Sequence, residues 1–229
     1  IQLAILWYVA FLFSLVLHEA SHGWAALRLG DPTAYHAGQV TLNPIPHIKR
    51  EFIGTVVVPI LSFVLGGWMM GWASAPYNPR WALYYPKRSA LMALAGPAAN
   101  LFIFLVATFF IKLGYAYGIF EAPQHINFSQ VTISVQAGIW ASVAKMLSIF
   151  FSLNLILCIF NLLPLPPLDG SQLLLLFAKG SWQTKIHQFL FHPQFSFLGL
   201  FAAWYLFNPI FDPIHHICIN LLYPGISYY

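Results

Sequence analysis

The chain has 229 residues, of which 59% are hydrophobic and 7% charged, and its mean hydropathy is +0.72. Roughly a quarter of the residues in a soluble globular domain are charged, so this composition excludes an ordinary soluble domain. It also excludes a disordered chain and a nucleic-acid-binding protein, because both need many more polar groups. The net charge of +4 is expected to reflect membrane topology. Cys158 and Cys218 lie in apolar runs and are expected to be buried thiols.

Long charge-free stretches predict the helices that cross a membrane, because a bilayer core of about 30 Å needs about 20 apolar residues. The stretches are 1–17 (continuing as a helix to Arg28), 52–79, 89–111, 146–168, 186–211 and 213–229. We therefore expect an all-α polytopic membrane protein with a single embedded domain over 1–229. The expected parts are a helix over 1–29, a loop region over 30–88, helices over 89–112 and 138–170, and C-terminal membrane helices over 171–229. The number of crossings after Lys185 stays open.

The stretch 52–79 differs from the others because glycine and proline interrupt it, and these residues break helices in a membrane. If it crosses the bilayer, the ten lysine and arginine residues divide equally between the two faces. If it is re-entrant, eight share one face and only Lys112 and Lys145 lie opposite. The positive-inside rule favours the re-entrant segment, with the eight-charge face cytoplasmic and the N-terminus outside.

The first helix carries His18-Glu19-Ala20-Ser21-His22, an HExxH sequence. Histidines at i and i+4 lie on one helix face and can bind one zinc ion, and the glutamate between them can take a proton from water. Charged groups are costly inside an apolar span, so each one suggests a function. The alternative is a polar patch that lines a water cavity or packs against another helix.

Catalytic zinc needs a third protein ligand and an open fourth position. Glu51 lies beside Lys49 and Arg50 and is expected to be a solvated surface charge, while Asp31 and Asp212 each precede a proline in a predicted turn. Asp169 remains, directly after a charge-free span.

Depth in the membrane supports this choice. His18 lies about 15 Å below the cytoplasmic end of its helix, at 1.5 Å per residue. With a re-entrant 52–79, the span 146–168 returns toward that same face, and a proline-rich end can present Asp169 at a matching depth. With a full crossing, Asp169 would lie near the opposite face.

The sequence resembles the site-2 protease family of intramembrane zinc metalloproteases. Three motifs carry the resemblance: His18-Glu19-Ala20-Ser21-His22, Gly96-Pro97-Ala98-Ala99-Asn100 and the stretch Asn161–Gly170. The segments 29–33 and 42–48 resemble the compact bacterial branch without PDZ insertions, although Lys49 stands where relatives often carry an acidic residue.

The resemblance implies that His18, His22 and Asp169 bind zinc and that Glu19 is the catalytic base. It implies a position near the scissile carbonyl for Asn161, and we hypothesise that its amide stabilises the oxyanion. It also implies a three-helix catalytic core with a re-entrant segment, to which we add a small β-edge loop. The function expected is cleavage of peptide bonds in or near transmembrane segments of membrane-anchored substrates, as in regulated intramembrane proteolysis. The location expected is the bacterial cytoplasmic membrane, with the active site toward the cytoplasmic side.

A substrate helix must be locally extended before cleavage, because its carbonyls are hydrogen-bonded within the helix. Gly38–Leu42 alternates polar and apolar residues and is a candidate edge strand for such a segment, or else a plain surface loop. Gly96 and Asn100 share a helix face, which favours close helix packing and an interhelical hydrogen bond.

Two other functions stay open. One is a non-hydrolytic metal-binding membrane protein, such as a transporter or a sensor, although the internal repeats typical of transporters are missing from the sequence. The other is an inactive scaffold, which the intact Glu19 disfavours.

Overall fold

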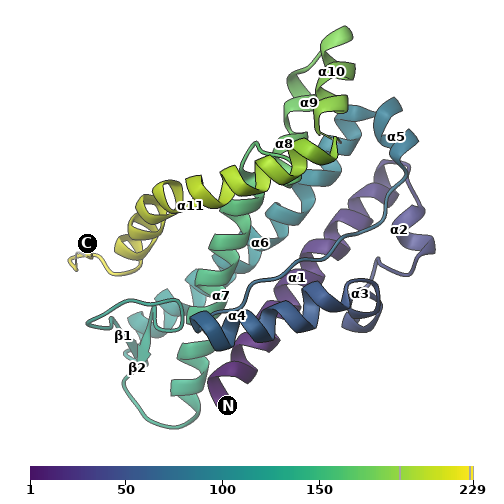
Figure 1. The fold of residues 1–229 in the computed structure, drawn as a ribbon. Helices are drawn as coiled ribbons and strands as arrows, with labels where there is room; N and C mark the ends of the chain where they lie inside the picture. The colour runs from purple at the N-terminus through teal and green to yellow at the C-terminus, as the bar shows by residue number, and fades with distance from the viewer. Residues whose placement is uncertain (191, 227, 229) are drawn as a thin grey trace.

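The computed structural model describes residues 1–190, 192–226 and 228. Three long helices form its centre: α1 (Gln2–Leu29), α6 (Pro86–Ala116) and α7 (Ile139–Leu162). Helix α6 packs against both α1 and α7 (Figure 1). Together with α11 (Pro193–Leu222), these are the helices in the described part of the chain that are long and apolar enough to cross a membrane. The fold is therefore the all-α polytopic membrane fold that the composition predicts.

The chain turns sharply at the end of α1. Gly30 has a positive φ of 105° and ends the helix with backbone hydrogen bonds to Ala26 and Leu27, a conformation that glycine adopts without strain. Two short helices follow, α2 (Thr33–His36) and α3 (Pro44–Arg50). The Asn43 side chain caps the second of them by accepting from the Ile45 N–H.

The segment between α3 and α6 enters the bundle and returns. It contains a π-helical turn, η1 (Ile53–Val57), which continues into α4 (Val58–Gly66), and together they are shorter than a bilayer requires. Residues 67–78 form neither helix nor strand, and they lead back to α5 (Pro79–Tyr84) at the end of the bundle where α1 stops (Figure 1).

A hydrogen bond from Arg88 Nη1 to the Leu29 carbonyl joins the start of α6 to the end of α1. The intervening chain therefore begins and ends at one end of the bundle, as the re-entrant topology requires.

Of the two alternatives for Gly38–Leu42, an edge strand or a surface loop, the structure shows the loop. These residues form a turn and bends, because the backbone N–H groups of Gly38 and Gln39 bond back to Tyr35 and Ala34. The sheet that the structure does contain lies at the opposite end of the bundle, where β1 (Phe120–Glu121) pairs antiparallel with β2 (Ile133–Ser134).

After α7 the chain forms three short helices before the last long one: α8 (Asp169–Gln172), α9 (Leu174–Phe177) and α10 (Ser181–Leu190). Helix α11 then runs obliquely across α7 (Figure 1). The turn expected at Asp212 is absent from the described residues: α11 is continuous through Pro209 and Pro213, and Asp212 lies exposed on it. Most of the 186–211 and 213–229 stretches thus form one helix, α11, whereas 186–190 belong to α10 and the chain after Leu222 is not helical where it is described. Residues 191, 227 and 229 lie outside the described residues.

Candidate metal centre

The two histidines of the HExxH sequence meet one turn apart on α1. His18 Nε2 and His22 Nε2 are 3.0 Å apart, and the two residues are 6% and 8% exposed. Their side chains point toward α6 at Gly96, where a Cβ atom would lie 2.4 Å from His22 Nε2 and 2.5 Å from His18 Nε2. The glycine therefore provides the space that the imidazoles occupy.

Asp169 reaches the same place from the far end of α7. Its Oδ2 lies 3.2 Å from His18 Nε2 and 3.2 Å from His22 Nε2. The approach depends on Gly170, since a Cβ atom there would lie 2.2 Å from the Leu162 carbonyl oxygen. A side chain at this position would thus separate α8 from the end of α7.

The hydrogen atom on His22 can be assigned from its neighbour. His22 Nδ1 lies 2.8 Å from the Met92 carbonyl oxygen, which can only accept a hydrogen bond. Nδ1 is therefore the donor, and in the neutral imidazole Nε2 carries a lone pair.

A chain of hydrogen bonds makes the same assignment for His18. Asn154 Nδ2 donates to the Phe150 carbonyl oxygen, so its Oδ1 accepts from Asn100 Nδ2 at 2.9 Å. Asn100 Oδ1 then faces His18 Nδ1 at 2.6 Å, so this nitrogen donates and Nε2 again carries a lone pair. Partners of this kind orient histidine ligands in metalloproteins.

Three electron-pair donors thus face one another at 3.0 to 3.2 Å, an arrangement that repels unless a cation lies between them. Tetrahedral zinc with bonds of about 2.0–2.1 Å keeps its ligand atoms about 3.3 Å apart. His18, His22 and Asp169 therefore fit zinc in both donor type and spacing.

Glu19 lies beside this cluster. Its Oε1 is 4.0 Å from His18 Nε2, and the residue is 5% exposed. One donor atom from each of His18, Glu19 and His22 lies within 4.8 Å of the others. The carboxylate is close enough to act on a water molecule at the cluster without taking the place of Asp169.

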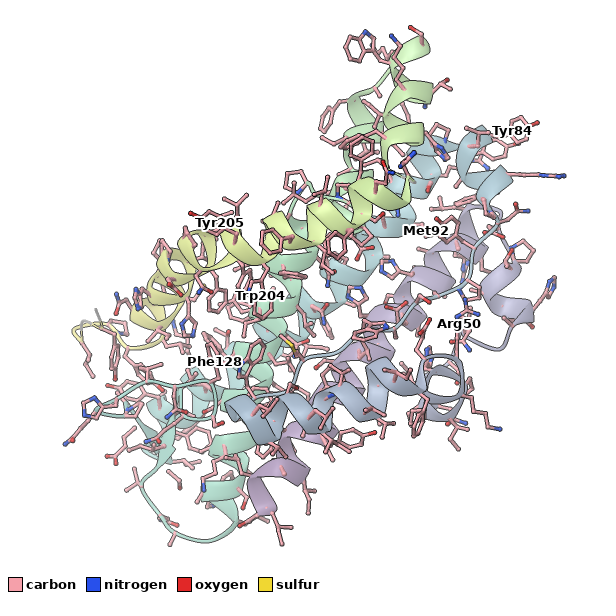
Figure 2. All side chains as sticks on the ribbon, in the orientation of Figure 1. Arg50, Tyr84, Met92, Phe128, Trp204 and Tyr205 are labelled. Atoms are coloured by element: carbon pink, nitrogen blue, oxygen red, sulfur yellow. The ribbon has the colours of Figure 1, made fainter. Side chains whose placement is uncertain are left out.

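A cavity of about 920 Å³ opens onto the cluster. Helix α1, residues 68–77, the end of α7, α8 and the first half of α11 line it. Trp204 is one of the apolar lining residues and lies on the side of α11 that faces the bundle, whereas Tyr205 lies on the opposite side (Figure 2).

Asn161 lines the cavity outside the cluster. Its Nδ2 donates to the Leu157 carbonyl oxygen at 3.0 Å, one turn back on α7. An amide nitrogen has two hydrogen atoms, so this bond leaves a second donor for another group.

The acidic residues set aside on sequence grounds lie away from the three donor atoms. Asp31 is buried and accepts from Thr33 and Asn78, and Asp212 is exposed. Glu51 is more than a solvated charge, because it is half-buried and accepts from Ser74.

Sequence reasoning underestimated two residues. It predicted an interhelical hydrogen bond for Asn100, which the structure confirms, but it did not foresee that the partner is His18. It did not consider Asn154, although an amide in an apolar span is itself a signal of a polar contact.

Comparison with known proteins identifies the family. The sequence matches the model of peptidase family M50, the site-2 proteases, over residues 6–201. The chain belongs to peptidase family M50. It is 31% identical over 196 residues to "Putative zinc metalloprotease YwhC" of Bacillus subtilis (strain 168), an alignment that covers 85% of this chain and 79% of the relative.

Two mycobacterial proteins named "Putative zinc metalloprotease Rip2" also match. The one from Mycolicibacterium smegmatis is 30% identical and the one from Mycobacterium tuberculosis (strain H37Rv) is 32% identical, each over 159 residues. These alignments cover 69% of this chain and 52% of the relatives, so the chain spans about half of their length. No solved structure matches the chain. The M50 protein described here is a zinc metalloprotease of the site-2 protease type.

Proposed function

We propose that this protein is an intramembrane endopeptidase in which His18, His22 and Asp169 hold the zinc ion and Glu19 is the catalytic base. The observation that carries the proposal is the convergence of two imidazole lone pairs and one carboxylate oxygen at 3.0 to 3.2 Å. The spacing suits the metal that the family uses, and the cavity gives a substrate access to it.

Zinc supplies Lewis acidity here when bound, since it lowers the pKa of water toward about 7 and polarises a peptide carbonyl. Glu19 then accepts the proton of the attacking water and passes it to the amine of the leaving fragment. The free hydrogen of the Asn161 amide is available to the developing oxyanion. Asn100 and the Met92 carbonyl hold the two imidazoles in place throughout.

The surroundings of the cluster favour a substrate that is itself embedded in the membrane. The four long apolar helices surround the cavity or lie next to it, and its lining is mostly apolar. A substrate segment must leave its helix before its carbonyl can react, and residues 68–77 provide an extended wall beside which it can lie. Membrane-anchored proteins or peptides are therefore the proposed substrates, as in regulated intramembrane proteolysis.

The proposed orientation follows from charge. Eight of the ten lysine and arginine residues fall on the side of the re-entrant segment where α1 ends and α6 begins. By the positive-inside rule this side is cytoplasmic, in the cytoplasmic membrane of a bacterium, and the metal centre opens toward it.

The experiment compares the purified protein with its Glu19→Gln variant in liposomes that contain a single-span reporter. We expect the variant to keep its zinc, measured by elemental analysis, and to lose cleavage. Glu121→Gln, the same change in β1, serves as the matched control and should cleave normally.

Continued cleavage by Glu19→Gln would show that another group is the base. A wild-type protein that holds zinc but cleaves no membrane-anchored reporter would support the other candidate, a non-hydrolytic transporter or sensor.

A further inference from the structure

Asp31 is a buried acidic residue that the proposed chemistry does not use. It is 2% exposed, although a buried carboxyl group is costly unless its oxygens are hydrogen-bonded. Oδ1 accepts from the N–H and the hydroxyl of Thr33, and Oδ2 accepts from the Asn78 N–H at 2.7 Å. Three donors thus converge on one side chain, from two segments that are far apart in the sequence.

One of these segments continues into the cavity wall. Residues 68–77 all line the cavity, and Asn78 follows them directly. The wall is also hydrogen-bonded to η1 and to the end of α3. The Trp72 N–H donates to the Gly54 carbonyl in η1, and Arg50 Nε, at the end of α3, donates to the Ser74 carbonyl.

The other side of Asp31 belongs to the helix that carries the metal-binding histidines. The Asp31 N–H donates to the Ala26 carbonyl at 2.8 Å, in the last turn of α1. His22 lies one turn before Ala26 on that helix. The backbone of Asp31 is therefore attached to α1, while its carboxyl group is attached to the end of the wall.

We propose that Asp31 is a positioning residue that sets the distance between the cavity wall and the metal centre and thereby the affinity for substrate. The inference rests on the proposed function, since it takes the cavity as the place where the substrate lies. A segment held between the wall and the metal needs both sides at a fixed separation. Apolar packing of Met69 and Tyr77 against α1 contributes to this separation, and the hydrogen bond to Asp31 fixes the end of the wall relative to α1.

Substitutions can separate this link from the local turn. Asp31→Asn offers one acceptor oxygen to three donors, so it must lose part of the connection. Thr33→Val removes the hydroxyl donor of the local turn and keeps the bond from Asn78 to Asp31. This variant therefore shows the effect of disturbing the turn while the link to the wall stays intact.

A second pair tests the same bond from the other side. Asn78→Pro removes the N–H that bonds Asp31, whereas Asn78→Ala keeps it, and both lose the Asn78 side chain that caps α5. The φ of Asn78 is −83°, which is close to the range that proline adopts.

The experiment measures two properties of each variant in the Glu19→Gln background, so that no turnover is needed. The first is amide hydrogen exchange across residues 72–78. The second is the affinity for a fluorescent single-span peptide in detergent micelles. We expect faster exchange and a Kd raised by between about 2-fold and 30-fold in Asp31→Asn and Asn78→Pro. Thr33→Val and Asn78→Ala should match the parent, and zinc content should stay the same in all.

Unchanged exchange or unchanged affinity in both Asp31→Asn and Asn78→Pro would overturn the inference. If one of these variants does not fold, the other carries the test. Failure of the proposed function is visible separately, as cleavage by Glu19→Gln or its absence in the wild type.

Discussion

Replacing Gly96 with alanine should weaken zinc binding without unfolding the helix. The added Cβ would lie 2.4 Å from His22 Nε2 and 2.5 Å from His18 Nε2, about 1.0 Å short of the 3.4 Å at which ordinary contact begins. Neither imidazole can retreat freely, because Asn100 and the Met92 carbonyl hold their other nitrogens. The methyl group therefore displaces the two atoms that are proposed to bind zinc.

The expected magnitude comes from two opposing effects. Alanine is favoured over glycine inside a helix by about 1 kcal/mol, so α6 itself does not weaken. Overpacking a rigid site typically costs about 1–3 kcal/mol, and the cost here falls on the ligand geometry. At 1.4 kcal/mol for each factor of ten, we expect zinc affinity to fall by roughly 5-fold to 150-fold.

The assay is a competition titration with a zinc chelator of known affinity, with helical content followed by circular dichroism. Gly66→Ala is the matched control, because a Cβ there would be 3.4 Å from the nearest atom, Trp68 Nε1. If Gly96→Ala binds zinc as tightly as the wild type, the proposed ligand set is wrong or the imidazoles are mobile.

Two further outcomes follow from the same geometry. Asn154 does not touch the cluster, but Asn154→Leu should lower zinc affinity by about tenfold, because the substitution frees Asn100 to turn its oxygen away from His18. The chelator titration used for Gly96→Ala measures this change. An unchanged affinity would show that the hydrogen bonds from Asn154 to Asn100 and His18 do not orient His18. Zinc removal with a chelator should abolish cleavage and lower thermal stability, and free zinc at a hundred times its Kd should restore about 2.7 kcal/mol. A melting temperature that does not change with zinc would argue against a site that joins α1 to α8.

The sequence alone was sufficient for the local part of the site. His18 and His22 are four residues apart on one apolar helix, and this spacing by itself puts them on one face. Charge counting between the apolar stretches selected the re-entrant topology, and that topology selected Asp169 by depth. The first inference uses the helical period within one segment, and the other two compare the charges and lengths of several segments.

What depended on contacts between segments was missed or misplaced. The alternation in Gly38–Leu42 left an edge strand and a surface loop open, and the backbone hydrogen bonds from Gly38 and Gln39 back to α2 produce the loop. Asp31 has the local hydrogen bonds expected of a turn, and its bond to Asn78, 47 positions away, could not be inferred from its neighbours.

The amino-acid order by itself determined the membrane helices, the pair of histidines and the glutamate between them, because helical periodicity and hydrophobic length act over a few turns. Only the tertiary structure decided which amides orient those histidines and which extended segment forms the wall of the cavity. These choices depend on the close approach of α1, α6 and α7, and Gly96 and Gly170 allow it by lacking a Cβ.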